Sequence, residues 1–428
     1  MKANKKSESI LNSRPILVIA NSSWYINHYR SLLLKKIANK NKLITMAPVD
    51  ESSIKLSKDS IFIPWRVHRS NDLNIFSLIF SFLKMMLLVR AIKPKLIHSH
   101  TLKTNLLSSI VAFLYGIPII ISFSGMGRLS KSKGFKLFCF KLVLNLISFF
   151  SVRERNSRFS WTTNFSKSYL IFQNPIDKNI FDLDVPNLNN HKKIIPGSGL
   201  PNLYFRENPK NKMNKWINKN IDPNIKLKSI TLIYCGRLLK SKGIYIFIEI
   251  LKSSPNLKGI IFGSTDPSSK ESISEVEIDS IKDKYKNIKF LGNKIDPLLK
   301  INEQFPIVLV PSEYGEGLPR TILESLSLKI PVICSKEALS GIFDTNQLNY
   351  AKNNSPQEYF KQILLIVDNY KNNFLKNKLD IGYNFVKTKF SEKNIVKSTI
   401  TIYSYLLDKN NSSYLTKKNK KESFWLAQ

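Results

Sequence analysis

The sequence predicts an α/β protein with two doubly wound units, each a parallel sheet covered by helices on both faces. Short apolar runs typical of buried strands alternate with longer helical segments up to residue 195, and the alternation starts again at Ile230. A polar stretch rich in Asn, Lys and Pro separates the two series. The length of 428 residues also exceeds what one compact core usually serves. Two such units in tandem predict a ligand-binding cleft at the carboxyl ends of their strands.

The individual elements follow from the apolar runs and the residues that bound them. In the first unit we expect strands at Arg14–Ala20, Leu43–Ala47, Ile61–Pro64, Lys95–His100, Ile117–Ser122, Tyr169–Gln173 and Lys193–Ile195. In the second unit we expect strands at Ile230–Cys235, Lys258–Phe262, Ile288–Leu291, Pro306–Val310 and Pro331–Cys334. Expected helices include one ending near Ala38, then Leu73–Ile92, Gly243–Leu251, one from Pro319, Pro356–Tyr370 and Asn394–Leu407.

Composition divides the chain further. We expect a first Rossmann-like domain at residues 1–200, a polar linker or insertion at 201–228, a second Rossmann-like domain at 229–391, a C-terminal helix at 392–408 and a basic tail at 409–428.

The charge balance is unusual for an enzyme. The chain has 66 Lys and Arg against 31 Asp and Glu, a formal net charge of +35. Such a charge attracts polyanions, either nucleic acid or an anionic membrane face, although part of it can reflect the codon usage of an AT-rich genome. The lysines are spread, and no helix-turn-helix, RRM or zinc-finger pattern is visible, so we expect no specific nucleic-acid partner.

The cysteines and the hydropathy indicate the compartment. Cys139, Cys235 and Cys334 are far apart and odd in number, with no disulfide or metal spacing, which fits a reducing cytoplasm. The basic N-terminus has a short apolar run that is better interpreted as a first strand than as a signal peptide. No uninterrupted apolar stretch reaches about 20 residues, so we expect no transmembrane helix.

The most informative stretch runs from Pro311 to Leu326. It follows an apolar strand, carries Gly315 and Gly317, and then opens a helix near Pro319. A strand, a glycine loop and a helix N-terminus place backbone N–H groups and a positive dipole end where an anion can bind. Glu316 in the loop and Glu324 in the helix can accept hydrogen bonds from sugar hydroxyls.

This stretch, with the pattern P-S-x-x-x-E-G-L-P-R-x-x-L-E-S, resembles the retaining nucleotide-sugar glycosyltransferases of family 4, which have the two-domain GT-B fold. The resemblance implies that Glu316 lies by the donor sugar and that Glu324 binds the ribose. It also implies that the neighbouring loop residues surround the donor: Gly315, Gly317, Leu318 and Pro319. The alternative is a solvated loop glutamate and a helix-surface glutamate.

A second motif follows the strand that ends at Cys235. Gly236 and Gly243 bound a loop in which Arg237 and Lys242 are five positions apart, and a guanidinium with an ammonium can grip a diphosphate. The pattern G-R-x-x-x-x-K-G matches the family and assigns both cations to the leaving diphosphate, where they would stabilise developing charge. The alternative is two ordinary surface cations. We expect no cofactor and no metal, because no Asp-x-Asp motif follows a strand and these cations stand in for the metal.

Two further segments at strand ends are less decisive. The run Ile195-Pro-Gly-Ser-Gly resembles a turn that closes the first domain near the cleft in this family, which places Gly199 beside the donor; a plain turn is equally compatible. His98 and His100 end another strand, and we expect their rings to point to opposite faces, which makes a shared metal site unfavourable. His100 can face the cleft on the acceptor side, or it can be structural.

The segment Ser122-Phe-Ser-Gly-Met-Gly127 departs from the better-known family pattern. Many relatives have a histidine just before the first glycine, where this chain has Ser124. The branch that acts on lipid-linked sugars often lacks this histidine, and the resemblance therefore places Ser124, Gly125 and Gly127 on the acceptor side. The glycines let a ligand approach the backbone closely.

Two apolar segments in the first unit are candidates for a membrane contact. Residues 75–89 are best explained as a helix that covers the sheet. Residues 135–150 combine Phe and Leu with lysines inside and beside the run, which favours a helix in the membrane interface over a purely structural one.

Together these features predict a metal-independent retaining glycosyltransferase at the inner face of the cell membrane. It would move a sugar from a nucleoside diphosphate onto a membrane-associated acceptor, most readily an undecaprenyl-diphosphate-linked glycan in bacterial surface polysaccharide synthesis. Alternatives are a nucleotide-sugar epimerase of the same fold, a degenerate inactive member, and a nucleic-acid-binding protein.

Overall fold

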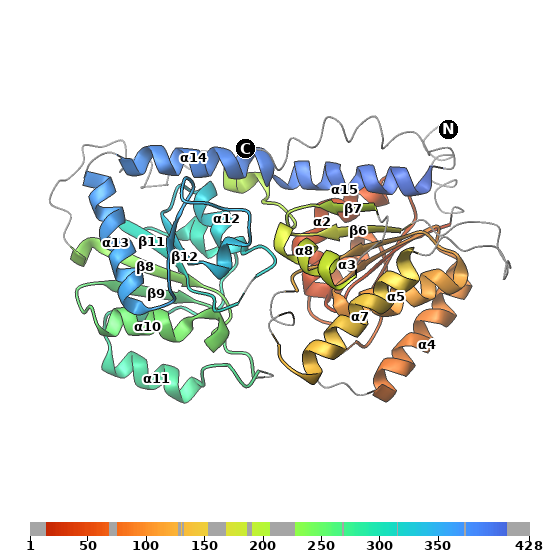
Figure 1. Ribbon diagram of the computed structural model, residues 1–428, viewed down its shortest axis with the longest axis horizontal. Coiled ribbons are helices and arrows are strands. Elements are labelled where there is room, and N and C mark those ends of the chain that lie inside the picture. Colours follow the sequence, from red (N-terminus) through yellow and green to blue (C-terminus); the bar gives the residue numbers. More distant parts are fainter. Residues whose placement is uncertain are drawn as a thin grey trace.

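The chain folds into two α/β domains, each built on one parallel sheet (Figure 1). The GT-B arrangement expected from the sequence is thereby confirmed. The computed structural model describes residues 14–67, 75–126, 130, 132–152, 168–185, 191–205, 227–267, 269–314, 316–371 and 374–408.

The first domain contains a seven-stranded parallel sheet with the order β3-β2-β1-β4-β5-β6-β7. Its central strands are buried on both faces, as expected for a sheet covered by helices on each side, whereas the edge strands β3 and β7 are partly exposed. The strands are β1 (Ile16–Ile19), β2 (Leu43–Ala47), β3 (Ile61–Pro64), β4 (Leu96–His100), β5 (Ile119–Ser122), β6 (Ser168–Phe172) and β7 (His191–Ile194).

Alternate residues of β1 enter two different cores. Leu17 and Ile19 join the core beneath α4, α5, α7 and α8, while Ile16 and Val18 join the core beneath α2 and α15 (Glu392–Leu407). This alternation shows why the strand is apolar throughout. The helices around this sheet are α2 (Ser23–Ala38), α3 (Ser53–Asp59), α4 (Ile75–Ile92), α5 (Leu102–Tyr115), α7 (Phe135–Val152) and α8 (Pro175–Asp184).

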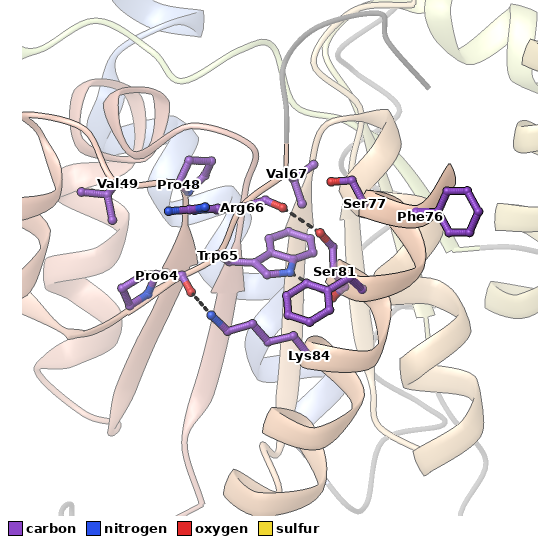
Figure 2. Close-up of a pocket in the computed structure, with 11 residues that line it drawn as sticks. Pro48, Val49, Pro64, Trp65, Arg66, Val67, Phe76, Ser77, Ser81 and Lys84 are labelled. Carbon is purple, nitrogen blue, oxygen red and sulfur yellow. Dashed lines mark hydrogen bonds between the residues drawn. The ribbon is translucent and has the colours of Figure 1, made fainter. Parts of the chain in front are cut away.

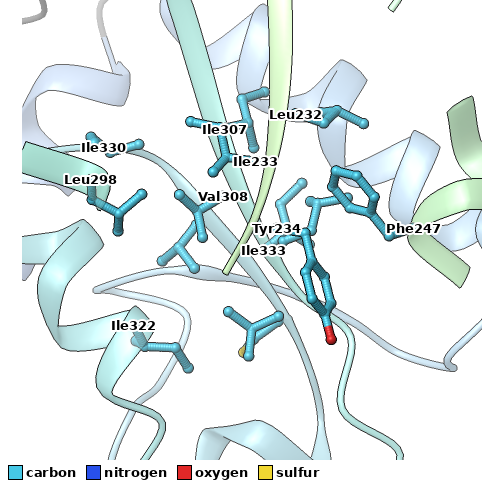
Figure 3. Close-up of a cluster of buried hydrophobic side chains, with 14 of the residues drawn as sticks. Leu232, Ile233, Tyr234, Phe247, Leu298, Ile307, Val308, Ile322, Ile330 and Ile333 are labelled. Atoms are coloured by element: carbon cyan, nitrogen blue, oxygen red, sulfur yellow. The ribbon is translucent and has the colours of Figure 1, made fainter. Parts of the chain in front are cut away.

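The second domain has a six-stranded parallel sheet with the order β10-β9-β8-β11-β12-β13. Figure 3 shows part of its single large core, where Ile233, Val308 and Ile333 come from three neighbouring strands and have no exposed surface. The strands are β8 (Ile230–Cys235), β9 (Lys258–Phe262), β10 (Ile288–Phe290), β11 (Phe305–Val310), β12 (Val332–Ser335) and β13 (Asn349–Ala351).

The helices of this domain are α10 (Ile244–Lys252), α11 (Glu275–Lys284), α12 (Arg320–Ser327), α13 (Pro356–Lys371) and α14 (Phe374–Lys389). Two of them, α11 and α14, were not expected from the sequence. Helix α11 buries only Ile278 and Ile281, which is too few apolar residues for a clear helical period. Helix α14 contains Gly382, an unfavourable helix residue, but a Cβ there would lie 2.9 Å from Leu326, so glycine permits close packing on α12.

The last helix, α15 (Glu392–Leu407), returns to the first domain, where it packs on α2 (Figure 1). The crossing is fixed by two backbone hydrogen bonds: Leu200 N donates to Phe390 O at 2.8 Å, and Glu392 N donates to Leu200 O at 2.8 Å. None of the helices in the described part of the chain has the length and apolarity needed to cross a membrane.

Candidate functional site

The candidate site lies where the loop before α12 meets the first domain. A Cβ added to Gly125, which follows β5, would lie 3.0 Å from the backbone nitrogen of Gly317. Gly125 has φ +110°, which favours glycine, and the close approach adds a second reason for a residue without a side chain. The glycines of the two motifs therefore face each other across the domain boundary. Gly315 and Gly127 lie outside the described residues.

Glu316 is held by two partners from its own domain. Its Oε2 lies 2.7 Å from the Nζ of Lys242, and its Oε1 accepts a hydrogen bond from Ser312 Oγ. Lys242 also lies over the ring of Tyr314, with Nζ 5.1 Å from the centroid. Burial disfavours the charged ammonium, but Glu316 and Tyr314 together outweigh burial and raise the pKa of Lys242 above its ordinary value. The structure thus brings together two residues that are far apart in the sequence.

Glu324 is paired within its helix. Arg320 Nε donates to Glu324 Oε1 at 2.7 Å, one helical turn away, and the Arg320 guanidinium lies 5.2 Å from the centre of the Tyr29 ring. Glu324 is 8% exposed. Burial raises the pKa of Glu324 above its ordinary value, and the neighbouring Arg320 limits that rise. The sequence motif contains Arg320, but only the fold shows that it covers Glu324.

Arg320 also connects the two domains. Its NH1 donates to the carbonyl of Gly199 at 3.3 Å and contacts Ser198 Oγ at 3.4 Å. A Cβ on Gly197 would lie 2.9 Å from the Leu318 side chain, so Leu318 packs against this same turn. Both Gly197 and Gly199 have positive φ. The turn at residues 197–199 therefore reverses the chain and also contacts Leu318 and Arg320 of the second domain. A plain turn would not require these contacts.

Arg237 lies apart from the glutamates. Its NH1 forms an ion pair with Asp266 at 2.9 Å, and 56% of its side chain is exposed. Gly243, at the other end of this loop, has φ +75° and approaches Pro311 so closely that a Cβ would lie 2.0 Å from its carbonyl oxygen. Gly236 packs against Gly263, because a Cβ added to Gly263 would lie 1.9 Å from the carbonyl oxygen of Gly236. The loop thus packs tightly against its neighbours while its arginine remains open to a ligand.

A network in the first domain, which sequence reasoning did not identify, holds the two glycine loops together. Asn174 caps α8 by accepting a hydrogen bond from Asp177 N at 2.7 Å, and its Nδ2 donates to Gly317 O and to Glu316 O, the latter at 3.3 Å. Asp177 Oδ1 accepts from Met126 N at 3.1 Å. Burial raises the pKa of Asp177 to about 6. The signal in the sequence is an Asn-Pro helix start directly after β6.

The expectation for the two histidines was wrong. The rings of His98 and His100 have centroids 4.1 Å apart, because residues two apart in a strand point to the same face. Burial lowers the pKa of both well below the ordinary value, so both are neutral at physiological pH. His98 bonds to Tyr403 of α15 at 2.6 Å. His100 has no exposed surface and contacts Tyr25 Oη at 3.5 Å, and its place on the acceptor side stays a prediction.

The remaining predicted position, Ser124, is partly exposed beside Gly125. The site therefore offers an exposed guanidinium (Arg237), a partly buried ammonium (Lys242) and two carboxylates (Glu316 and Glu324), all carried by the second domain. Cations of this kind bind phosphate oxygens, and carboxylates accept from hydroxyls. The described residues contain no group of three or more His, Cys, Asp or Glu that can hold a metal ion.

Two family models match the chain. The model for glycosyl transferases group 1 matches residues 217–379, and the model for glycosyl transferase 4-like proteins matches residues 15–152. Together they cover most of both domains and include the motifs around Arg237, Glu316 and Ser124.

The chain is also similar to characterised proteins. It is 27% identical over 282 residues to the capsular polysaccharide biosynthesis glycosyltransferase CapM of Staphylococcus aureus; the match covers 64% of this chain and 66% of CapM, just under two thirds of that relative. Anabaena Alr3699/HepE, solved with UDP, superposes with a TM-score of 0.66 at 16% identity, covering 91% of this chain and 99% of that one. WaaG, a glycosyltransferase involved in lipopolysaccharide biosynthesis, gives 0.62 at 13% identity, with coverage of 90% and 99%.

Proposed function

Because this chain belongs to the family 4-type glycosyltransferases of the GT-B fold, we propose that it transfers a sugar from a nucleoside diphosphate to a lipid-linked glycan, with retention of configuration. The product would be an intermediate of a bacterial surface polysaccharide. CapM acts in capsule synthesis and WaaG in lipopolysaccharide synthesis, according to their names, and both support this assignment.

The observation that carries the proposal is the contact between Lys242 and Glu316 at 2.7 Å, beside the glycine loop that opens α12. In the proposed complex, the donor diphosphate binds Lys242 and Arg237, which gives Arg237 a partner in addition to Asp266. Glu316 lies by the donor sugar. HepE, which shares the fold, was solved with UDP, and this supports a nucleotide donor.

Glu324 would bind the ribose after Arg320 gives up part of its contact. Because burial raises the pKa of Glu324, its carboxylate is a good acceptor for neutral hydroxyl donors. The nearby Gly317 and Gly199 are occupied by other backbone segments: an added Cβ would lie 3.0 Å from Gly125 Cα and 2.6 Å from Glu392 Cα, respectively.

In the reaction that we propose, the acceptor hydroxyl attacks the anomeric carbon on the face that the diphosphate leaves. The bond between the anomeric carbon and the diphosphate oxygen breaks, and the hydroxyl proton passes to that oxygen. Lys242 and Arg237 stabilise the charge that develops there, in the role that a metal ion has in other transferases. No cofactor is required by this scheme.

The acceptor would be membrane-associated. Helix α7 exposes Phe135 and Phe138 by 78% and 63%, and the chain carries a net charge of +35. Apolar rings and lysines together favour an anionic membrane surface, where each nearby lysine contributes about 1 kcal/mol. We therefore place the protein at the inner face of the cell membrane.

The test uses purified protein, a panel of UDP-, GDP- and dTDP-sugars, and a short polyprenyl-diphosphate-sugar acceptor, with EDTA present. We expect one donor to yield a glycosylated lipid, and NMR of the product to show the anomeric configuration of the donor. Epimerised sugar or free nucleotide without any lipid product would identify the epimerase alternative. If no donor binds or reacts, the inactive alternative is correct.

A further inference from the structure

A pocket lies at the carboxyl ends of the first domain's edge strands, between residues 48–49 after β2, residues 65–67 after β3 and the start of α4 (Figure 2). Its volume is about 1010 Å³. Its lining includes Pro64, Trp65, Arg66, Phe76, Phe80 and Lys84. Most of them are apolar, two are cationic and none is acidic. A pocket of this composition suits a molecule with an apolar part and an anionic part.

The wall of this pocket is fixed before any ligand binds. The Trp65 indole is buried, and its Nε1 donates to Ser81 O of α4 at 3.0 Å. Ser81 Oγ donates to Arg66 O at 2.7 Å, and Lys84 Nζ donates to Pro64 O at 3.0 Å (Figure 2). These bonds tie α4 to the end of β3. A preformed concave site of this size is typical for small ligands.

The pocket continues into an exposed apolar stripe. Phe76 and Phe80 are 84% and 70% exposed, and Leu83 and Leu87 follow on the same face of α4. Single exposed apolar residues are ordinary, but a continuous row that begins in a pocket is a marker of a binding surface. The Arg66 and Lys84 side chains are also exposed, so their charges remain available to an anion.

The pocket and the candidate site are connected through α2. Ser23 Oγ donates to Pro48 O at 2.5 Å, and Trp24 N donates to Asp50 Oδ2 at 2.9 Å, so the loop after β2 is bonded to the start of α2. The same helix carries Tyr29, which lies under Arg320 in the candidate site. Helix α2 therefore contacts both the pocket and the candidate site, and both lie at the carboxyl ends of the strands in the first domain's sheet.

We propose that this pocket binds the acceptor lipid itself, with the first isoprene units against Phe76, Phe80 and Trp65 and the diphosphate beside Arg66 and Lys84. The acceptor sugar would then extend along the start of α2 toward Glu316. This inference rests on the proposed function, because it assumes a lipid-linked acceptor. It differs from general membrane attachment, since it assigns one lipid molecule to one cavity.

The test measures binding of farnesyl diphosphate, a soluble isoprenyl diphosphate, by calorimetry with UDP at saturation so that the donor site is filled. Phe80→Ser lies in the pocket, and Leu87→Ser is the matched control on the same stripe outside it. We expect Phe80→Ser to weaken farnesyl diphosphate binding at least about tenfold, and Leu87→Ser to change it less than about twofold. Arg66→Gln should weaken it severalfold and reduce its salt dependence.

Three results would overturn the proposal: wild-type protein that does not bind farnesyl diphosphate, a Phe80→Ser variant that binds it normally, or inorganic diphosphate that displaces it with equal affinity. Equal losses in Phe80→Ser and Leu87→Ser would show a nonspecific apolar surface and would also refute it. Binding of UDP by wild-type protein is recorded separately. Its failure would refute the proposed nucleotide donor, whatever the result with the lipid.

Discussion

The two domains share a topology but present different surfaces. Helices α4 and α7 of the first domain expose four phenylalanines by more than 60%, at positions 76, 80, 135 and 138. In the second domain, Phe374 at the start of α14 is the one described phenylalanine with comparable exposure. The proposed donor-binding charges are concentrated in the second domain instead, at Arg237, Lys242, Glu316 and Glu324. The difference fits the proposed division of tasks, with donor binding in the second domain and apolar contacts with the membrane in the first.

The largest expected effect concerns the charges of the second domain. Lys242→Ala removes the ammonium beside Glu316, and we expect transfer to fall by about 10²–10³-fold, since this is the loss typical of one electrostatic donor to a developing anion. Lys240→Ala is the matched control, because Lys240 is exposed in the same loop. Steady-state kinetics measure the effect. Equal rates for Lys242→Ala and wild type would refute the assignment of catalysis to this half.

A second prediction concerns the carboxyl group of Asp177, which accepts a hydrogen bond from Asn174, the residue that bonds to the second domain. The pKa of Asp177 is raised to about 6 from 3.8, so the folded state keeps a proton that the unfolded state loses between these values. The free energy of unfolding should therefore fall as pH rises through this window, by roughly 3 kcal/mol. Asp177→Asn should remove this part of the pH dependence. Denaturant unfolding at pH 4 to 7 measures it, and parallel curves for both proteins would contradict the prediction.

The third prediction tests the contact between the domains. Gly125→Ala places a methyl group 3.0 Å from Gly317 N, at a backbone φ of +110°. We expect transfer to fall about tenfold or more, because the two loops can no longer approach each other. Gly134→Ala is the control: it also has positive φ, but nothing lies within 4 Å of its added Cβ. If both variants lose activity equally, backbone strain rather than domain contact is the cause.

Sequence reasoning predicted the local motifs of the candidate site but not the contacts that join the two domains there. The loop of Glu316 and the loop of Lys242 each lie in one contiguous motif, so their positions at strand ends could be predicted from local spacing, and the roles that the resemblance assigns to them stay predictions. The contacts of Asn174 with Glu316 and of Arg320 with Gly199 depend on how the domains meet, and no local pattern encodes that geometry.

The same limit applies to the first domain. Its strands could be predicted because buried parallel strands are apolar throughout, as β1 shows. The pocket at Trp65 could not be predicted. It forms only where Trp65, directly after β3, meets helix α4, which begins at Ile75. The burial of His100 likewise depends on α2, which supplies Tyr25.

The smallest expected effect concerns the exposed phenylalanines of helix α7 in the first domain. Replacing both Phe135 and Phe138 with Ser should weaken partition onto phosphatidylglycerol-containing vesicles by about tenfold, because two exposed rings on α7 are lost. The matched control replaces Leu364 and Leu365 of α13, which are 45% and 44% exposed in the second domain, with Ser. Vesicle cosedimentation at several salt concentrations measures both. If the α13 variant loses as much affinity as the α7 variant, membrane contact is not confined to the first domain. If neither loses any but salt abolishes binding, the net charge of +35 alone accounts for the attraction.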